Sequence, residues 1–308
     1  MTTRKLGRTD LAIEPLIFGC NVLGWTADEA QSFAVLDAFV DHGFTAFDTA
    51  DVYGKGKSET ILGNWMKARG NRNKVLVFTK VGADNWKGER DLSAKWIEEA
   101  IENSLKRLQI DHVDLYQSHW PDADTPQEET LGALDKLVKA GKVRWIGSSN
   151  QDNGLLSEAL DISKTKSWAR YETLQNEYNL YDRDGFGAVQ DLCVKEGMSG
   201  IGYFSLARGF LSGKYRSAAD ADKSPRGKGI VDKYLNPKGD RVLAALDAVS
   251  KRHNAKPTEV ALAWIIAQPG VGGPIASGTD VEQVASLAKG ARLGLYEDDL
   301  SELTAAGA

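Results

Sequence analysis

Residues 43–54 read Gly-Phe-Thr-Ala-Phe-Asp-Thr-Ala-Asp-Val-Tyr-Gly, a short apolar run that leads into an acid and a phenol, Asp48 and Tyr53. Two further apolar runs end in the same manner, one in Lys80 and the other in His119. A charged group that leaves water at the end of a strand needs a partner, because an unpaired buried charge is costly. An acid, a phenol, an ammonium and an imidazole at strand ends therefore predict groups that pair with one another and carry out chemistry.

The composition limits the classes of protein to which the chain can belong. The 308 residues are 42% hydrophobic and 26% charged, which suits one large α/β barrel or two ordinary domains. The net charge of −5 argues against a nucleic-acid partner. The first residues lack the apolar segment of a secretory signal, and the longest apolar stretch, near residues 260–267, is too short to cross a membrane. The two cysteines, Cys20 and Cys193, have no CxxC partner, so we expect a reduced, cytoplasmic protein without a structural metal.

Short β-rich runs alternate with helical patterns along the chain. Eight runs are expected to be strands: 16–19, 45–50, 75–80, 113–118, 143–148, 173–177, 200–205 and 273–277. Six segments between them have the periodicity of helices: 28–42, 58–69, 93–108, 127–140, 153–164 and 184–196. This alternation predicts a single (β/α)8 TIM barrel domain over residues 1–308. A doubly wound sheet is the alternative, but residues 18–25 lack the Gly-x-Gly-x-x-Gly turn that usually follows its first strand.

Two segments stand outside this alternation. Residues 4–14 are expected to form a small N-terminal β-hairpin that could close the bottom of the barrel. Residues 205–238 show no clear strand or long helix and are rich in Gly, Asp, Lys and Arg. A loop of that length is usually functional or disordered, and this one follows the seventh strand, where barrels often bind phosphate.

The four strand-end groups have the chemistry that carbonyl reduction requires. A ketone or aldehyde that accepts hydride needs a proton on its oxygen, and Tyr53 could supply it because a nearby ammonium, Lys80, favours the phenolate. Asp48 would pair with Lys80, and His119 could donate a hydrogen bond to the carbonyl oxygen. None of these groups can deliver hydride, so a cofactor must carry it. Taken singly, the same residues could be a turn former, a solvated lysine, a loop aromatic and a packed histidine.

The motifs resemble those of the aldo-keto reductase superfamily. Six stretches carry the resemblance: 48–54, 78–80, 118–121, 146–150, 174–178 and 202–209. The first three hold the Asp, Tyr, Lys and His tetrad in the order and spacing of the family, and the chain looks closest to the bacterial and channel-β-like branches. The resemblance implies a (β/α)8 barrel that binds NADPH in an extended form across its mouth and reduces aldehydes or ketones.

The resemblance also implies which residues hold the cofactor. Ser149, Asn150 and Gln175 would bind the nicotinamide carboxamide, Tyr203 would stack on the ring, and Asn21 would lie nearby. Residues from the motif after the seventh strand would surround the pyrophosphate: Ser205, Leu206, Ala207, Gly209, Lys214 and also Arg216. An alternative for Asn150 is a helix cap for the segment that begins near residue 153.

The stretch after the eighth strand departs from the family pattern. Members that prefer NADPH usually carry Lys or Arg there to hold the 2′-phosphate, but residues 277–286 contain no cation. Ser277, Thr279 and Gln283 can still form hydrogen bonds to an adenosine phosphate or ribose. We therefore expect NADPH from the family pattern and leave NADH or dual use open. A helix cap is the alternative for Ser277, and a solvated helical position is the alternative for Gln283.

The substrate cannot be named from these motifs. Trp25 and Trp86 lie in loops at the expected mouth and are candidates for the walls of an apolar substrate pocket, although they could simply pack against the barrel. The leading hypothesis is an NAD(P)H-dependent reductase of small carbonyl compounds, possible as a homo-oligomer. A slow-turnover nicotinamide sensor like the channel β subunits is the first alternative. A metal-dependent hydrolase using Asp48 and His119 is the second, but no further strand-end His or carboxylate pair completes its site.

Overall fold

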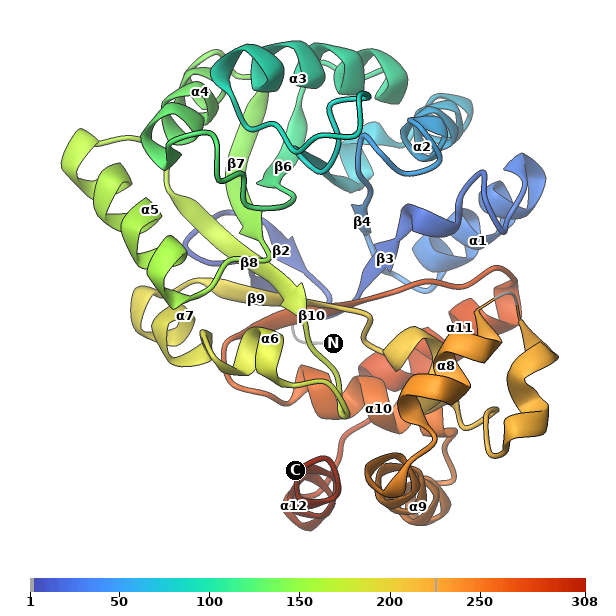
Figure 1. Cartoon of the computed structure of the whole chain (residues 1–308). Helices are drawn as coiled ribbons and strands as arrows, with labels where there is room; N and C mark the ends of the chain where they lie inside the picture. The colour runs from blue at the N-terminus through green and yellow to red at the C-terminus, as the bar shows by residue number, and fades with distance from the viewer. Residues whose placement is uncertain (1–2, 225) are drawn as a thin grey trace.

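Eight parallel strands close on themselves into a barrel, and the helices surround them (Figure 1). The computed structural model describes residues 3–224 and 226–308. The strands are β3 (Ile17–Gly19), β4 (Ala46–Asp48), β5 (Leu76–Val81), β6 (Val113–Ser118), β7 (Val143–Ser149), β8 (Tyr171–Glu177), β9 (Ser199–Tyr203) and β10 (Val271–Ala276). They follow one another around the barrel in chain order, and pairing of β10 with β3 closes the ring. The predicted (β/α)8 barrel is therefore confirmed.

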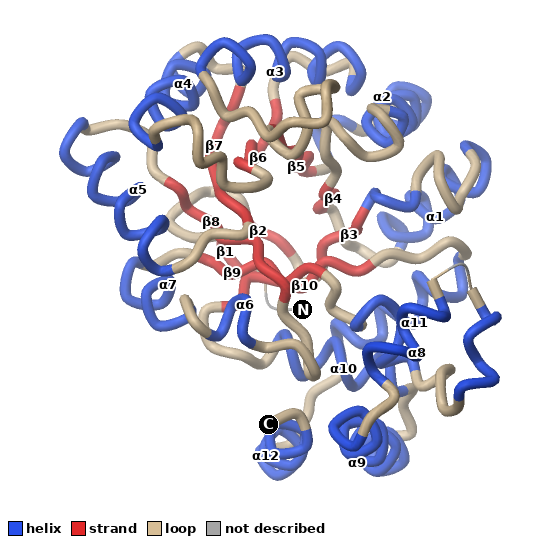
Figure 2. The backbone as a smooth tube through the Cα atoms, in the orientation of Figure 1, coloured by secondary structure: helices blue, strands red, loops and turns tan. Residues whose placement is uncertain are grey.

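The helices form the outer layer of the barrel, as the blue tubes around the red strands show in Figure 2. They are α1 (Glu29–Asp41), α2 (Lys57–Arg69), α3 (Ala94–Leu108), α4 (Gln127–Lys139), α5 (Asn153–Lys166), α6 (Asp184–Gly187), α7 (Gln190–Glu196), α8 (Gly227–Tyr234), α9 (Pro237–His253), α10 (Pro257–Ile266), α11 (Val281–Arg292) and α12 (Glu297–Ala306). In the described part of the chain, none of them is long and apolar enough to cross a membrane.

The prediction of one helix over residues 184–196 is wrong, because this segment folds as two short helices, α6 and α7. The break lies at Val189, whose φ of −117° is not helical. Two glycines weaken the first half, since glycine has a low helix propensity. Gly185 also packs against β8 so closely that a Cβ there would lie 2.5 Å from the carbonyl oxygen of Glu177.

The described part of residues 205–238 contains no strand and, before α9 begins at its end, no long helix, as expected, but it does contain short helices that the sequence pattern did not show. Two 3-10 helices, Ala207–Ser212 and Ala218–Lys223, precede α8, and α9 begins at Pro237. In α8, Ile230 and Tyr234 lie four residues apart on one face and are both buried. A helix of only eight residues offers a single such pair, so the periodic signal is weak.

The barrel interior is apolar at the bottom and polar at the top. At the bottom, the predicted hairpin is confirmed as β1 (Arg4–Lys5) paired with β2 (Ala12–Ile13), and its apolar side chains join the inward-facing residues of the strands. That cluster consists of Leu6, Leu11, Ile13, Ile17, Ala46, Phe78, Leu115, Ile201 and Ile275. Side chains two residues apart in a strand point to the same face. Asp48, Lys80 and Gln117 each lie two residues beyond a member of this cluster, so the strands carry all three into the upper part of the barrel.

Candidate active site

Three of the four predicted catalytic groups meet at the top of β4 and β5. The ammonium of Lys80 donates hydrogen bonds to a carboxylate oxygen of Asp48 and to the carbonyl of Thr49, the latter at 2.7 Å. It also lies 3.3 Å from the hydroxyl of Tyr53. Lys80 is completely buried and Asp48 is 2% exposed, so the ion pair is shielded from solvent. One buried cation therefore contacts both the acid and the phenol.

Two glutamine side chains hold the second oxygen of Asp48. Gln117 donates to Asp48 Oδ2 at 3.1 Å, and Gln175 donates to the same oxygen at 3.0 Å. Gln175 also lies 3.1 Å from Gln117 Oε1, so the two amides and the carboxylate form a triangle. The sequence analysis missed Gln117, although strand alternation from Leu115 would have placed it on the inner face of β6.

Burial and pairing act in opposite directions on the charges of this group. Burial disfavours the ammonium of Lys80, but Asp48 and Tyr53 together outweigh it and raise the pKa of Lys80 above its ordinary value. Burial is the largest influence on Tyr53 and raises the pKa of its phenol, while Lys80 acts in the opposite direction. The sequence predicted only the second influence. In the structure, Lys80 limits a rise in the pKa of Tyr53 that burial alone would make larger.

His119 lies directly beside this group. Its ring packs edge-on against Tyr53 with 5.8 Å between the ring centroids. Burial, reinforced by repulsion from Lys80, lowers the pKa of His119 well below its ordinary value, so the imidazole is neutral at physiological pH. Its Nδ1 atom is buried without a hydrogen-bond partner among the described residues. A buried nitrogen acceptor without a hydrogen bond costs less free energy than a buried N–H without one. Nδ1 is therefore expected to be the acceptor, with the proton on Nε2.

The residues expected at the nicotinamide are linked to one another and to His119. Asn150 has a left-handed backbone with φ of 59°, and its side chain donates to the carbonyl of His119 at 2.9 Å. Tyr203 donates to Asn150 Oδ1 at 2.8 Å, and Ser149 donates to the carbonyl of Gln175 at 2.7 Å. Asn150 is not the cap of α5, because Asp152 fills that position.

The backbone after β9 adopts an unusual conformation in the segment expected at the pyrophosphate. Phe204, Ala207, Arg208 and Gly209 all have positive φ angles, of 50°, 47°, 59° and 104°. Non-glycine residues rarely adopt this conformation, and runs of it can form backbone concavities that bind anions. The ammonium of Lys214 would lie 4.0 Å from a Cβ placed on Gly209, so a cation lies close to this turn.

The other residues expected around the pyrophosphate, Ser205, Leu206 and Arg216, differ in their burial and in their contacts. Ser205 is buried and donates to the carbonyl of Gly202 at 2.9 Å, and Leu206 is half-buried at the start of the turn. Arg216 contacts the end of this segment, because its Nε donates to the carbonyl of Gly213 at 2.7 Å. Its guanidinium forms a two-pronged ion pair with Asp247 of α9, at 2.7 and 2.8 Å.

The stretch after β10 divides into a part near the barrel and a solvated part. The hydroxyl of Ser277 lies 2.7 Å from the carbonyl of Gly19 and 2.8 Å from Asn21 Oδ1, which brings two predicted cofactor residues together. Ser277 does not cap α11, because Asp280 does so by accepting from the backbone N–H of Gln283. Gln283 is exposed, and its side chain accepts from the backbone N–H of Thr279 at 3.0 Å.

The two predicted pocket tryptophans are both strongly exposed, Trp25 at 57% and Trp86 at 46%. Arg226 lies over the ring of Trp25, with its guanidinium carbon 4.4 Å from the ring centroid. Burial, reinforced by repulsion from Arg208, lowers the pKa of Arg226. The sequence analysis missed this pair of arginines. The segment after β9 therefore reaches the loop after β3 and brings positive charge with it.

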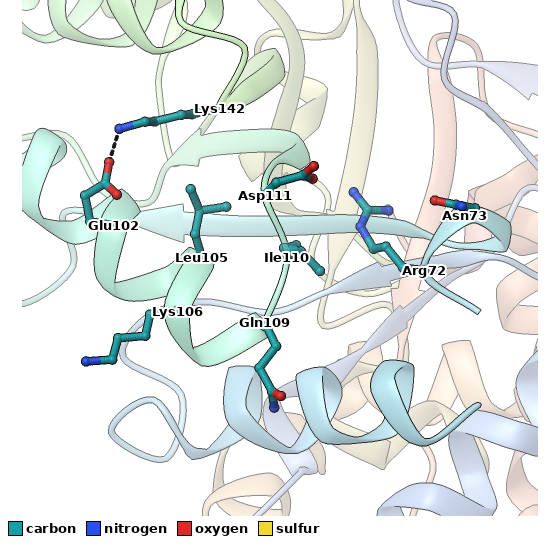
Figure 3. A pocket seen from close by; sticks show the side chains of 9 residues that line it. All are labelled: Arg72, Asn73, Glu102, Leu105, Lys106, Gln109, Ile110, Asp111 and Lys142. Atoms are coloured by element: carbon teal, nitrogen blue, oxygen red, sulfur yellow. Dashed lines mark hydrogen bonds and ion pairs between the residues drawn. The ribbon is translucent and has the colours of Figure 1, made fainter. Parts of the chain in front are cut away.

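A separate hollow of about 750 Å³ lies at the opposite end of the barrel (Figure 3). Its lining includes Arg72, Asp111 and Lys142, which precede β5, β6 and β7, whereas the candidate site lies where strands end. Lys142 forms an ion pair with Glu102 at the rim. This hollow does not belong to the candidate site. No cluster of three His, Cys, Asp or Glu side chains suited to a metal ion occurs within residues 3–224 and 226–308.

Comparisons with known proteins agree with the geometry. The model of the aldo/keto reductase family matches residues 15–308. Protein tas of Escherichia coli (strain K12) is 31% identical over 340 aligned residues, which cover 99% of this chain and 97% of that protein. The uncharacterized oxidoreductase YrpG of Bacillus subtilis (strain 168) is 32% identical, over 97% of this chain and 93% of that protein. A Schizosaccharomyces pombe protein named aldo-keto reductase yakc, with NADP(+) in its name, is 32% identical over 86% of this chain and 79% of its own. The chain therefore belongs to the aldo/keto reductase family and is an NAD(P)H-dependent oxidoreductase.

Proposed function

We propose that the protein reduces aldehydes or ketones to alcohols and that Tyr53 is the general acid. The observation that carries the proposal is the position of Lys80, whose ammonium contacts both Asp48 and the hydroxyl of Tyr53, at 3.3 Å from the latter. His119 lies beside the same phenol. A proton donor, a cation that stabilises its conjugate base and a neutral hydrogen-bond donor are thus present together.

The roles of the four residues follow from their contacts. His119, neutral and with its proton on Nε2, donates a hydrogen bond that orients the carbonyl oxygen and stabilises the charge developing on it. Tyr53 transfers its proton to that oxygen. Lys80 stabilises the resulting phenolate, and Asp48 keeps the buried ammonium charged. When bound, the reduced nicotinamide supplies hydride to the carbonyl carbon.

The residues around the mouth suit a nicotinamide dinucleotide. Ser149, Asn150 and Gln175 offer hydroxyl and amide groups near His119, as a carboxamide requires. The left-handed turn at residues 207–209 and the ammonium of Lys214 suit a diphosphate. Beside these, Arg226 offers a cation at the mouth.

We propose NADPH as the preferred cofactor, with NADH or dual use as the alternative. The NADP(+) in the name of the yeast relative supports NADPH. The exposed Asp280 and Glu282 near Thr279 and Gln283 weaken the case for strict preference, because carboxylates repel a 2′-phosphate. The buried, unpaired Cys20 and Cys193 suit a reducing compartment, so a cytoplasmic location is part of the proposal.

The decisive experiment compares Tyr53→Phe with the wild-type protein. The variant should lose at least about a hundredfold in turnover of a reactive aldehyde, because general acid catalysis typically contributes that much or more. Cofactor titration by fluorescence quenching should change little. Tyr296→Phe is the control, since Tyr296 is 71% exposed at the start of α12. Wild-type turnover in Tyr53→Phe would show that the phenol is not the acid, and slow turnover with tight cofactor retention in the wild type would favour the sensor.

A further inference from the structure

A second set of buried polar side chains lies on the outer side of the barrel, next to the tetrad. We call it the outer cluster, and it consists of Asp51, Glu59, Thr79, Arg107 and Tyr116. Thr79 and Tyr116 neighbour Lys80 and Gln117 in their strands, so their side chains point away from the barrel interior. Asp51 comes from the loop between Asp48 and Tyr53. The outer cluster and the tetrad are therefore separated by little more than the strand backbone.

Glu59 is fully paired within the outer cluster. Thr79 donates to Glu59 Oε1 at 2.6 Å, and Arg107 donates to Glu59 Oε2 at 2.7 Å. The carboxylate of Glu59 is completely buried, and these contacts use both of its oxygens. The charge of Arg107 is therefore already matched by Glu59.

Asp51 and Tyr116 are not paired in this way. Asp51 is 1% exposed, and neither of its carboxyl oxygens has a partner with hydrogen-bond geometry among the described residues, although the neighbouring backbone N–H of Val52 favours the ionised carboxyl. The hydroxyl of the fully buried Tyr116 is equally without a partner in the same part of the chain. Buried polar groups are nearly always paired in proteins, so three unpaired oxygens on two neighbouring side chains call for an explanation.

The surroundings of Asp51 make its ionised form unfavourable. Four groups face it: Glu59 from α2, Arg107 from α3, Lys80 from β5 and Tyr116 from β6. Burial, reinforced by repulsion from Glu59, raises the pKa of Asp51 to about 7, against the attraction of Arg107, the backbone N–H of Val52 and Lys80. The single positive charge of Arg107 is already balanced by the carboxylate of Glu59. A proton on Asp51 therefore leaves these three side chains without net charge.

The backbone connects Asp51 directly to the tetrad. Its N–H donates to the carbonyl of Lys80 at 3.4 Å, and Tyr53 follows two residues later, with its own N–H bonded to the carbonyl of Ala50 at 3.1 Å. Lys80 is among the groups whose charge acts on the carboxyl of Asp51, so a charge on Asp51 acts in turn on Lys80 through a medium of low polarity, and through Lys80 on Tyr53.

We propose that Asp51 is a positioning residue of the reductase described above: by gaining or losing a proton it changes the charge behind Lys80, and so sets how readily Tyr53 gives up its own proton. The proton exchanges with bulk solvent. With Asp51 protonated, Lys80 is free to stabilise the phenolate of Tyr53. With Asp51 ionised, the added negative charge opposes the phenolate, and carbonyl reduction slows.

The pH profile of carbonyl reduction tests this proposal. In the wild type, single-turnover reduction should slow by about threefold to tenfold as the pH rises through the titration of Asp51. Asp51→Asn keeps the shape of the side chain but cannot ionise, so that inflection should disappear and the fast rate should persist to higher pH. Asp135→Asn is the matched control. Asp135 lies in α4 and is also buried, but its carboxylate accepts a hydrogen bond from the backbone N–H of Ala169 at 3.0 Å. This control should keep the wild-type profile.

A second measurement needs no cofactor and no turnover. Ultraviolet titration of the phenol, taken as the difference between each protein and its Tyr53→Phe form, reports when Tyr53 ionises. In Asp51→Asn, Tyr53 should ionise at a lower pH than in the wild type. If Asp51→Asn does not fold, Glu59→Gln should move the wild-type inflection to lower pH, because it removes the like charge that opposes ionisation of Asp51.

An unchanged profile together with unchanged phenol titration in Asp51→Asn would overturn the proposal. The outcome is separable from failure of the proposed function. If Tyr53→Phe is inactive while Asp51→Asn keeps the wild-type profile, the acid is assigned correctly and only the role of Asp51 is wrong. If Tyr53→Phe remains fully active, the assignment of the acid itself is wrong.

Discussion

Replacing Asp51 by Asn should make the fold more resistant to unfolding, and the gain should grow with pH. Asp51 is buried without hydrogen bonds to its carboxyl oxygens from the described residues, so its charged form is unfavourable in the native state but not in the unfolded chain. Its pKa is raised from 3.8 to about 7. Between these two values the native protein holds a proton that the unfolded chain has released. The free energy of unfolding of the wild type therefore falls as the pH rises from about 4 to 7, and it is constant with respect to this group above that range.

The size of the effect follows from the two pKa values. Each pKa unit corresponds to about 1.4 kcal/mol, so ionisation of Asp51 destabilises the wild type by at most about 4 kcal/mol above pH 7. The amide in the Asp51→Asn variant does not titrate, which makes the free-energy difference between this variant and the wild type rise with pH by that amount. At pH 4 the two proteins should differ little, because a protonated carboxyl and an amide are similar in size and polarity.

Urea unfolding of the cofactor-free proteins at pH 5, 6, 7 and 8, followed by circular dichroism, measures this difference. Asp135→Asn serves again as the control. Asp135 accepts a backbone hydrogen bond and pairs with Lys139 at 2.6 Å, so its loss should destabilise the protein and give no gain that grows between pH 5 and 8. A constant difference between Asp51→Asn and the wild type over this range would refute the reasoning, because it would mean that Asp51 titrates alike in the folded and unfolded chains.

Two further predictions concern the site itself. Gln117→Leu removes one of the two amides that hold Asp48 Oδ2, so the free energy of unfolding should fall by about 1 kcal/mol and turnover should fall with it. Urea midpoints and turnover at saturating cofactor measure this, and an unchanged turnover would show that Gln175 alone positions Asp48. Lys214→Gln removes a cation near the turn at Gly209, so NADPH and NADH should both bind about tenfold more weakly, since both contain the diphosphate. A loss confined to NADPH in fluorescence titration would place Lys214 at the 2′-phosphate instead.

The barrel and the meeting of its strand-end polar groups could be predicted because the signals are local. The strands are short runs rich in apolar residues, and several end in a polar residue, among them β4 at Asp48, β6 at Ser118 and β7 at Ser149. All eight lie within two residues of the predicted bounds at each end. Strand alternation alone places Asp48 and Lys80 on the inner face, and register pairs Lys80 with Gln117 on the next strand. The convergence of these groups is therefore a consequence of pattern and topology together.

The remaining features depend on contacts between segments far apart in the chain. Arg216 was singled out from a local motif, and its ion pair with Asp247 of α9, 31 residues further along the chain, could not be predicted from that motif. The influence of Lys80 on Tyr53 was predicted from charge, whereas the larger influence of burial requires the packed structure. The sequence analysis did not single out Asp51. The carboxyl of Asp51 is without hydrogen-bond partners among the described residues because of how α2, α3 and β6 pack around it, and the local sequence does not predict that packing.

The contacts of Asp48 explain why Lys80 is the group that controls the phenol. One oxygen of Asp48 accepts from Lys80, and the other accepts from both Gln117 and Gln175. A carboxylate held on both sides cannot turn toward Tyr53 and take its proton. The ammonium is thus fixed 3.3 Å from the phenol by an acid that does not itself compete for the proton. A change in the charge around Lys80 therefore changes how readily the phenol of Tyr53 loses its proton. For this reason we expect the protonation of Asp51, on the other side of the strand, to affect the rate of the reaction.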